Sequence, residues 1–465
     1  MNLVYGVKDR PQAGKLIVFA FQQVLAILAA TIAVPAIIGN GMSQSAALFG
    51  AGVGTIVYLL FTKFRSPVFL GSSFAFIGSM FAAFAGGVSA SLGYLGLILG
   101  AVFAGLVYVV IALIVKFAGV KWIDKLMPAV VIGPTVSIIG LSLAGNAVGD
   151  LSLGKVMTDV TTQVIREGQI VEEVSQVSAA NPYIAMLCGA VTLFTVILCS
   201  VYGKKMMKLI PFIIGIVAGY IVAAIFTVIG IKTGNASLQL IDFSAFQDMK
   251  WFAIPEFTFL IAKDGLKELT ASHVISIAVA YVPVAFVVFA EHIADHKNLS
   301  SVIGSELLED PGLHRTLLGD GVGSMAGALF GGCPNTTYGE SVGCVAITGN
   351  ASVITILVTA ILCMIISFFG PFVTFLGSIP NCVMGGVCIT LYGFIAVSGL
   401  KMIQKVDLNE NRNLFVVAVI LICGIGGLSL TFGKVTLTEV ATALILGIIV
   451  NLITPNKGEK AEEAK

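Results

Sequence analysis

Acidic side chains occur at several points inside long apolar stretches of this sequence. Glu291 and Asp295 follow a long apolar run, and Glu340 lies inside another apolar segment. A charged side chain at the centre of a bilayer costs at least about 2.5–3.5 kcal/mol on the insertion scale, so each needs a function. No Lys or Arg lies deep in these segments, and a buried carboxyl group without a cationic partner favours its neutral form. We therefore expect these three acids to bind protons. Weaker candidates are Asp320 and Glu439.

The spacing of Glu291 and Asp295 places both on one face of a helix, with His292 to the side. An acid beside a histidine is also found in acid–base catalysis. No nucleophile–base set or metal cluster accompanies this pair, so we do not expect an enzyme. For Asp295 two interpretations stay open, a functional carboxyl group or a polar helix end. We expect His296 to end the helix in cytoplasmic water.

Two segments carry proline and glycine where a membrane helix would be expected. Residues 67–74 read Pro-Val-Phe-Leu-Gly-Ser-Ser-Phe, and residues 334–340 read Pro-Asn-Thr-Thr-Tyr-Gly-Glu. Such residues suit an extended piece that turns into a half-helix. The first N–H groups of a half-helix have no partners within it. We expect the amides around Ser73 and Phe74, and those at 339–341, to face a common site; two ordinary kinked helices are the alternative.

A flat heterocycle that carries both N–H and C=O groups fits these donors and acceptors. Uracil has two of each, and its ring can stack on Phe74 or Tyr392, although either aromatic alone is typical of simple packing. An inorganic anion fits less well, because the carboxylates would repel it. The predicted substrate-binding residues are Glu291, Glu340, Phe74, Gly339, Ser341, Tyr392 and Ser73.

The composition indicates that a membrane surrounds these residues. The chain has 465 residues, of which 57% are hydrophobic and 11% charged, and its mean hydropathy is +1.01. Ordinary soluble domains carry about 25% charged residues. The net charge of +1 gives no reason to expect a nucleic-acid partner. The eight cysteines show no metal-ligand spacing, no nucleotide-binding loop is found, and the polar amino end predicts no cleaved signal peptide. We expect no metal or cofactor other than the proton.

Apolar runs long enough to cross about 30 Å of hydrocarbon recur along the chain. Most of the 26 Lys and Arg residues fall in the connections that share a side with the amino end. The positive-inside rule then predicts a multi-pass protein of the cell membrane with both termini cytoplasmic. The fourteen predicted spans are 16–38, 45–62, 66–83, 92–117, 127–147, 182–202, 207–231, 273–296, 315–331, 333–350, 352–374, 377–397, 412–432 and 436–454.

The two halves of the chain repeat one another at an offset of seven spans. Residues 127–133 and 379–385 both read apolar-Pro-x-x-Val-apolar-Gly, and the interrupted spans three and ten also correspond. Because seven is odd, the second copy must be inverted in the membrane, and paired interrupted spans indicate a site at its midplane. The predicted regions are a first repeat (1–231), an external connection (232–272), a second repeat (273–454) and a cytoplasmic tail (455–465).

The motifs around the acidic residues resemble a known family. Ala-Glu-His-Ile-Ala-Asp-His at 290–296, Leu-Glu-Asp-Pro-Gly-Leu-His-Arg at 308–315, the string at 334–340 and Gly-Ser-Ser-Phe-Ala-Phe at 71–76 are similar to the uracil permease branch of the nucleobase–ascorbate transporters. The likeness runs from about residue 5 to 455. It implies an all-α fold of fourteen spans, with spans 1–4 and 8–11 as a core domain and spans 5–7 and 12–14 as a gate domain.

The resemblance also implies proton-coupled uptake of uracil by a homodimer joined through its gate domains. In such permeases the glutamates at the positions of Glu291 and Glu340 hold the base, the backbone at Phe74 and Gly339 completes the grip, and the tyrosine at Tyr392 contributes from the gate side. The chain departs from the family at three positions, where Ser341 replaces a frequent asparagine and Asp295 and Gln23 replace histidines of some members.

Three alternatives follow from these departures and from the site chemistry. The same fold can carry xanthine or another nucleobase instead of uracil. It can also carry an anion, as sulphate transporters of similar architecture do, although the acidic pair disfavours this. The third is a membrane enzyme that uses Glu291 and His292 as acid and base, which the lack of any further catalytic group disfavours.

Overall fold

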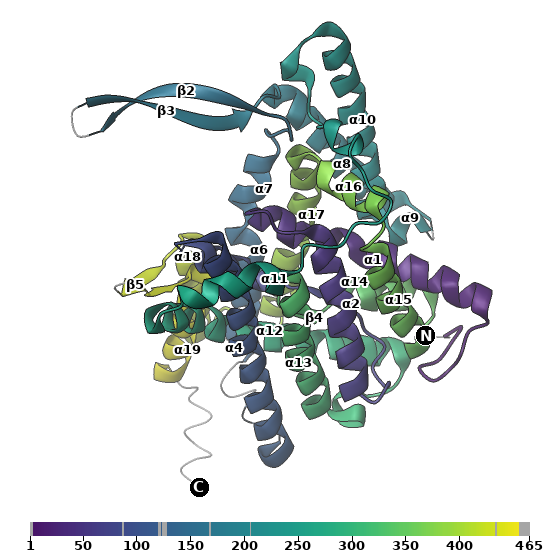
Figure 1. The fold of residues 1–465 in the computed structure, drawn as a ribbon. Helices are drawn as coiled ribbons and strands as arrows, with labels where there is room; N and C mark the ends of the chain where they lie inside the picture. The colour runs from purple at the N-terminus through teal and green to yellow at the C-terminus, as the bar shows by residue number, and fades with distance from the viewer. Residues whose placement is uncertain are drawn as a thin grey trace. The chain divides into compact units, whose positions relative to one another are not determined.

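A computed structural model describes residues 3–85, 88–119, 122, 128–166, 169–204, 206–432 and 435–454 (Figure 1). Most of these residues are helical, as expected where lipid offers the backbone no hydrogen-bond partners. Among them, eight helical segments are long and apolar enough to cross a membrane. They are α1 (Ala13–Ile38), α2 (Gln44–Phe61), α4 (Ala90–Ala118), α6 with α7 (Ala129–Ser142 and Ala144–Asp150), α8 (Pro182–Tyr202), α10 (Pro211–Thr233), α12 (Ala271–Ile303) and α17 (Asn381–Ile403).

Shorter helices and strands complete the described chain. The shorter helices are α3 (Ile77–Ala85), α9 (Met206–Leu209), α11 (Thr258–Ala262), α13 (Leu313–Gly331), α14 (Gly339–Thr348), α15 (Val353–Ile366), α16 (Gly370–Ser378), α18 (Asn411–Ile425) and α19 (Glu439–Ile453). Single turns are η1 (Phe74–Phe76), η2 (Ala236–Leu238), η3 (Ser244–Phe246), η4 (Lys263–Lys267) and η5 (Leu308–Gly312). The strands are β1 (Leu70–Ser72), β2 (Met157–Arg166), β3 (Gln169–Ser178), β4 (Asn335–Thr337), β5 (Leu430–Phe432) and β6 (Val435–Leu437).

Several predicted spans contain breaks that hydropathy does not indicate. The span predicted at 352–374 consists of α15 and the start of α16. Helix α16 begins at Gly370 and has Pro371 in its first turn. The span predicted at 412–432 is helical only to Ile425, because Gly426 and Gly427 end α18 and Gly427 adopts a φ of 69°. The count of fourteen crossings and the inverted seven-plus-seven repeat stay predictions.

The interrupted spans three and ten meet in a two-stranded antiparallel ribbon. Strand β1 pairs with β4 so that Leu70, Gly71 and Ser72 lie opposite Thr337, Thr336 and Asn335. The N–H of Tyr338 donates to the carbonyl of Phe69 at 3.1 Å, which extends the pairing at one end. Each strand then leads into a helix, η1 and α3 after β1 and α14 after β4. Both predicted extended pieces are present, and the alternative of two kinked helices is wrong.

Glycine at position 71 is required for this ribbon to close. A Cβ added to Gly71 would lie 2.3 Å from the ring of Tyr338. The Tyr338 hydroxyl donates to the carbonyl of Ser72 at 2.8 Å, which holds its ring across β1. A side chain at position 71 would therefore displace the residue that precedes α14.

The connection between the predicted spans 127–147 and 182–202 contains an unexpected hairpin. Strands β2 and β3 pair antiparallel over ten residues each, from Met157 opposite Ser178 to Arg166 opposite Gln169. Thr158, Asp159 and Val160 at the start of β2 are exposed, which suits a strand that water can contact. The connection predicted at 232–272 holds the short elements η2, η3, α11 and η4.

The chain divides into two compact units. The first comprises residues 1–143, 254–368 and 392–465, and the second 144–253 and 369–391. In the first, α2 and α13 lie side by side (Figure 1), and a Cβ on Gly50 would lie 2.3 Å from the carbonyl oxygen of Gly327. Such small residues let membrane helices approach closely. The assignment of spans to core and gate domains stays a prediction.

Helix α12 corrects the expectation for His296. The predicted span ended at residue 296, but the helix continues to Ile303 and the His296 side chain is 1% exposed. Its Nδ1 lies 2.8 Å from the carbonyl oxygen of His292, and its Nε2 lies 2.7 Å from the hydroxyl of Tyr58 on α2. These partners replace water, so the prediction that His296 ends the helix in water is wrong.

Candidate substrate and proton site

Helix α12 carries two of the predicted acidic residues. Glu291 and Asp295 are half-buried, whereas His292 between them is fully buried. The carboxylate of Asp295 accepts a hydrogen bond of 2.8 Å from the hydroxyl of Thr337 on β4. It also lies 3.8 Å from the position that a Cβ on Gly339 would occupy. Asp295 therefore lies against the junction of β4 and α14, and the interpretation that it ends the helix in water is wrong.

Glu340 lies in the first turn of α14. The first N–H with a partner inside this helix belongs to Val342, which donates to Tyr338 at 3.2 Å. The amides of residues 339–341 precede it, at the positive end of the helix dipole. Glu340 and Asp295 both lie close enough to Glu291 to interact with it electrostatically. The structure thus brings the three predicted proton-binding acids together.

The end of span three contributes an aromatic ring to the same region. Phe74 begins η1, and its half-buried ring meets the ring of Tyr392 edge to face at a centroid distance of 6.0 Å. Tyr392 is itself buried. The N–H of Ser73 donates to the carbonyl of Pro334 at 2.9 Å, so this amide extends the ribbon instead of facing a substrate. The predicted contribution of span three therefore rests on Phe74.

Ser341 has a structural role that its sequence position does not reveal. Its side chain is fully buried, and its hydroxyl accepts hydrogen bonds from the Phe69 N–H at 3.0 Å and from the Gln23 side chain at 2.5 Å. These contacts connect α14 to α1 and to the residue before β1. The hydroxyl thus holds the interrupted spans together, while the backbone of Ser341 belongs to the first turn of α14.

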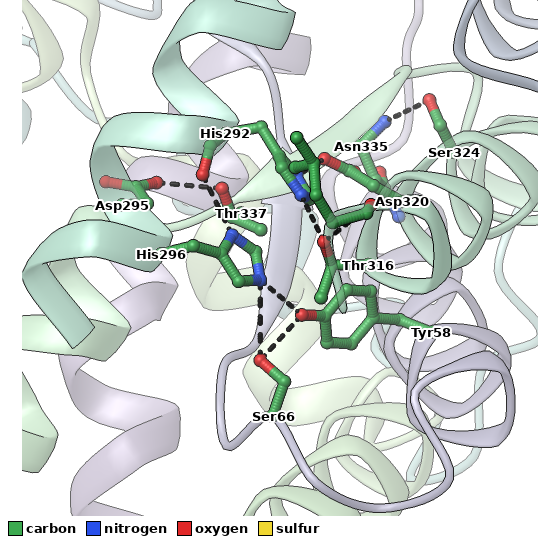
Figure 2. A network of polar contacts seen from close by, with 11 residues as sticks. Tyr58, Ser66, His292, Asp295, His296, Thr316, Asp320, Ser324, Asn335 and Thr337 are labelled. Atoms are coloured by element: carbon green, nitrogen blue, oxygen red, sulfur yellow. Dashed lines mark hydrogen bonds and ion pairs between the residues drawn. The ribbon is translucent and has the colours of Figure 1, made fainter. Parts of the chain in front are cut away.

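A buried network of polar side chains lies next to Asp295 (Figure 2). His292 lies 2.7 Å from Asp320 and 3.0 Å from Thr316, both on α13. The ring of His296 stacks on that of His292 at a centroid distance of 4.1 Å. From the sequence, Asp320 was only a weaker candidate and Thr316 was not a candidate. The signal that could have found this cluster is the pair of histidines four residues apart in an apolar helix, which places both rings on one side.

Asp320 and the acids of the site interact. Asp320 acts electrostatically on Glu291 and on Asp295. Glu439 begins α19 and approaches α3, where its carboxylate lies 3.6 Å from the position that a Cβ on Gly78 would occupy. Among the described residues, no group of three or more His, Cys, Asp or Glu side chains has an arrangement suited to a metal ion.

Known sequences place the chain in a family. The profile of the family described as Permease family matches residues 14–432. The chain belongs to this permease family. Uracil permease of Bacillus caldolyticus is 39% identical over 463 residues, which cover 99% of this chain and 96% of that protein. Uracil permease of Escherichia coli K12 is 32% identical, over 96% of this chain and 93% of that protein. The same organism's putative pyrimidine permease RutG is 31% identical, over 95% and 89%.

Solved structures resemble the permease in fold. The transmembrane domain of the cyanobacterial bicarbonate transporter BicA matches with a TM-score of 0.59 at 15% identity, over 96% of this chain and 99% of that one. The murine Solute Carrier 26 family member A9 anion transporter, in its inward-facing state, matches with a TM-score of 0.62 at 12% identity, over 96% and 69%. At such low identity these matches show a shared transporter fold only.

These observations settle the class of the protein. The permease is a multi-pass membrane transporter and not an enzyme. Its candidate site combines the first turn of a broken helix, a cluster of carboxyl groups and an aromatic pair in the first unit of the chain. This arrangement can hold a small polar molecule by its hydrogen-bonding edge and bind protons beside it.

Proposed function

We propose that this permease takes up uracil across the cell membrane by alternating access, coupled to protons. Its relatives from Bacillus caldolyticus and Escherichia coli, matched over nearly their whole length, carry the name uracil permease. The observation that carries the proposal is the position of the α14 first turn against the carboxyl groups of α12, with Asp295 beside Gly339 and Glu291 within electrostatic reach of Glu340.

The two kinds of group in this site complement the two kinds of group on uracil. The carboxyl groups of Glu291 and Glu340 accept from its N–H groups, and the amides of Phe74 and Gly339 donate to its carbonyl oxygens. A ring held this way can lie against Phe74 and Tyr392, whose edge-to-face contact at 6.0 Å supports an aromatic wall on that side. Ser341 supports this grip through Phe69 and Gln23.

Proton coupling follows from the crowding of acids. Glu291 and Asp295 on α12 and Glu340 in the first turn of α14 lie within electrostatic reach of one another. Ionising all three in a low-dielectric site would place like charges side by side without compensation. A proton therefore binds as part of the transport cycle. The neutral nucleobase binds best to the protonated site, so the proton and the nucleobase favour each other's binding.

The wider architecture is part of the proposal. Fourteen spans form an inverted repeat of residues 1–231 and 273–454, with both termini cytoplasmic and a homodimer joined through spans 5–7 and 12–14. The antiparallel pairing of β1 with β4, from equivalent positions of the two halves, supports an inverted repeat. The murine anion transporter that shares this fold is described in an inward-facing state, and a site that faces one side at a time is what alternating access requires.

Uptake into liposomes that contain only this protein tests the proposal. We expect labelled uracil to accumulate when the outside is made acidic relative to the inside, and the accumulation to disappear when a proton ionophore is added. Excess unlabelled uracil should compete, whereas xanthine and sulphate should not. No uptake of uracil would reject the substrate, and uptake that ignores the proton gradient would reject the coupling. Competition by xanthine or sulphate would reassign the cargo.

A further inference from the structure

The contact between His292 and Asp320 is buried and isolated from water. Both side chains are 0% exposed, and His292 Nδ1 lies 2.7 Å from Asp320 Oδ2. On the other side of the ring, Nε2 lies 3.0 Å from the hydroxyl oxygen of Thr316. The second carboxylate oxygen of Asp320, Oδ1, is buried and has no hydrogen-bond partner among the described residues. Figure 2 shows this group between α12 and α13.

The Thr316 hydroxyl determines how many protons the pair holds. Its oxygen lies 3.0 Å from the carbonyl oxygen of Leu313, to which it donates its single hydrogen. It then accepts from His292, so Nε2 must carry a hydrogen. If His292 is neutral, Nδ1 has a lone pair, and a contact of 2.7 Å requires a hydrogen on Asp320. In this loaded state the pair holds one hydrogen more than a carboxylate and a neutral imidazole.

The same atoms also satisfy a state with one proton fewer. The carboxyl hydrogen of Asp320 moves to Nδ1, and the hydrogen on Nε2 leaves as a proton while its electron pair stays on the nitrogen. The Thr316 hydroxyl then rotates from Leu313 and donates to Nε2. The pair is now a carboxylate that accepts from a neutral imidazole. Neither state leaves a ring nitrogen without a partner, so one proton can come and go without disrupting the core.

The neighbouring histidine cannot act in this way. Nδ1 of His296 lies 2.8 Å from the carbonyl oxygen of His292, which can only accept, so this nitrogen carries a hydrogen. Nε2 lies 2.7 Å from the hydroxyl oxygen of Tyr58, and that hydroxyl donates to Ser66 at 2.7 Å. Among the residues that the structure describes, the hydrogen-bond partners of His296 are a carbonyl and two hydroxyl groups, and none is a carboxylate. Its tautomer is therefore fixed by the backbone, and it provides a reference for His292.

The groups that face the pair are acids and phenols. Glu291 and Asp295 on α12 interact electrostatically with Asp320, and Glu340 on α14 acts on both of those acids. Tyr58 on α2 and Tyr108 on α4 also lie within its electrostatic reach. A proton lost from the pair thus adds a negative charge beside the carboxyl groups of the candidate site, and makes it easier for those groups to hold a proton.

We propose that the Asp320–His292 pair is a second proton-binding site, which exchanges the coupled proton in linkage with the carboxyl groups that hold the nucleobase. The inference rests on the proposed proton-coupled uptake and deepens it. In the loaded state the pair is neutral. In the unloaded state the negative charge of the pair stabilises a proton on the carboxyl groups of Glu291, Asp295 and Glu340. The pair and these carboxyl groups therefore do not both ionise.

Transport measurements in liposomes separate this role from a structural one. Asp320→Asn keeps a hydrogen-bonding group beside Nδ1 but cannot exchange a proton. We expect this variant to retain counterflow exchange of labelled uracil and to lose the stimulation of uptake by an inward proton gradient. Tyr58→Phe is the matched control, because it alters the buried contacts of His296 without removing an exchangeable proton, and it should keep the stimulation.

The outcomes distinguish a failure of the proposed proton coupling from a failure of the role assigned to the Asp320–His292 pair. If the unmodified protein shows no stimulation by the gradient, the proposed coupling fails, independently of the pair. If the unmodified protein is stimulated and Asp320→Asn is stimulated equally, the assignment of the pair is wrong. If Asp320→Asn loses counterflow as well, the variant has lost its fold or its substrate site. A measurement on the unmodified protein must then test whether the pair exchanges a proton.

Histidine nitrogen NMR on the unmodified protein supplies that decision. The chain has only four histidines, at positions 273, 292, 296 and 314, so selective labelling with ¹⁵N gives few signals, and His273→Gln and His314→Gln assign two of them. We expect Nε2 of His292 to lose its hydrogen as the pH rises or when uracil is withdrawn, while His296 keeps its hydrogen on Nδ1. A His292 spectrum that changes with neither pH nor uracil would overturn the proposal.

Discussion

The polar side chains in and around the candidate site of this permease each have a different kind of interaction partner. Asp320 has a buried histidine, Asp295 has the hydroxyl of Thr337, and Glu340 has the first turn of α14. Ser341 accepts from two donors in the interior. A substitution at each position is therefore expected to affect a different property, namely coupling, substrate affinity or stability.

Glu340→Gln should weaken the binding of uracil. The substitution removes a charged acceptor at the start of α14, and a hydrogen bond to a charged group contributes about 1.5–3 kcal/mol. This corresponds to a loss of affinity of roughly ten- to hundredfold. The measurement is the uracil-dependent rise in the unfolding temperature of the purified protein, since a ligand that binds the native state stabilises it.

The control for this prediction is Glu309→Gln, at an exposed acid outside the candidate site. It should leave the rise with uracil unchanged. An unaltered rise in the Glu340→Gln variant would show that Glu340 does not bind the substrate.

Ser341→Ala should lower stability before it affects chemistry. The change leaves the buried N–H of Phe69 without its acceptor, at a cost of about 1–3 kcal/mol for an unsatisfied group, and it leaves the Gln23 amide only its longer contact of 3.4 Å with the Ser341 carbonyl. Thermal unfolding without ligand measures the loss. Ser305→Ala, at an exposed serine just after α12, should have little effect. Equal unfolding temperatures for the two variants would contradict the supporting role of the Ser341 hydroxyl.

The β1–β4 ribbon is the element on which the site depends. It ends at Ser72 and Thr337, and from there the chain enters η1 on one side and α14 on the other. A ribbon of two short strands has only marginal stability in water. The β1–β4 ribbon is buried, and the packing of the surrounding helices stabilises its three residue pairs. The position of both helix starts therefore follows from the register of this ribbon.

Gly71→Ala should disturb the ribbon and the helix start together. The new Cβ would lie 2.3 Å from the Tyr338 ring, and overpacking of this kind costs about 1–3 kcal/mol. We expect a lower unfolding temperature and weaker uracil binding in the same variant.

The matched control for Gly71→Ala is Gly343→Ala, within α14. Apart from the adjoining backbone of α14, no atom of the described residues lies within 4 Å of a Cβ added at Gly343, and alanine in a helix is favoured over glycine by up to about 1 kcal/mol. This control should be neutral or stabilising. If Gly71→Ala behaves like Gly343→Ala, the close approach of Tyr338 does not constrain the ribbon.

The whole molecule must place its loops on the correct sides of the membrane. The exposed apolar side chains of α4, α8 and α10 are suited to lipid, whereas the β2–β3 hairpin has polar and exposed residues at its start, such as Thr158 and Asp159. We predict that this hairpin lies outside the cell and that the connection around Lys204 lies in the cytoplasm, as the distribution of basic residues indicates.

Single-cysteine labelling measures this topology. Seven of the eight native cysteines are buried, so Cys423→Ser gives a suitable background. In intact cells a membrane-impermeant maleimide should label Thr158→Cys, and it should label Lys204→Cys only after permeabilisation. Labelling in the reverse order would place the termini outside and reject the predicted orientation.

The sequence by itself determined the membrane class, the two interrupted spans and the acids at 291, 295 and 340, because hydropathy, proline–glycine punctuation and unpaired charge are local properties of the chain. Tertiary structure alone decided that β1 pairs with β4, that His296 is buried, and that Asp320 and Thr316 flank His292. Those outcomes depend on tertiary contacts, namely β1 with β4, α2 with α12, and α12 with α13, and hydropathy along the chain does not specify such contacts. A polar residue in an apolar helix looks the same whether its partner is water or a side chain on another helix, and only packing distinguishes them.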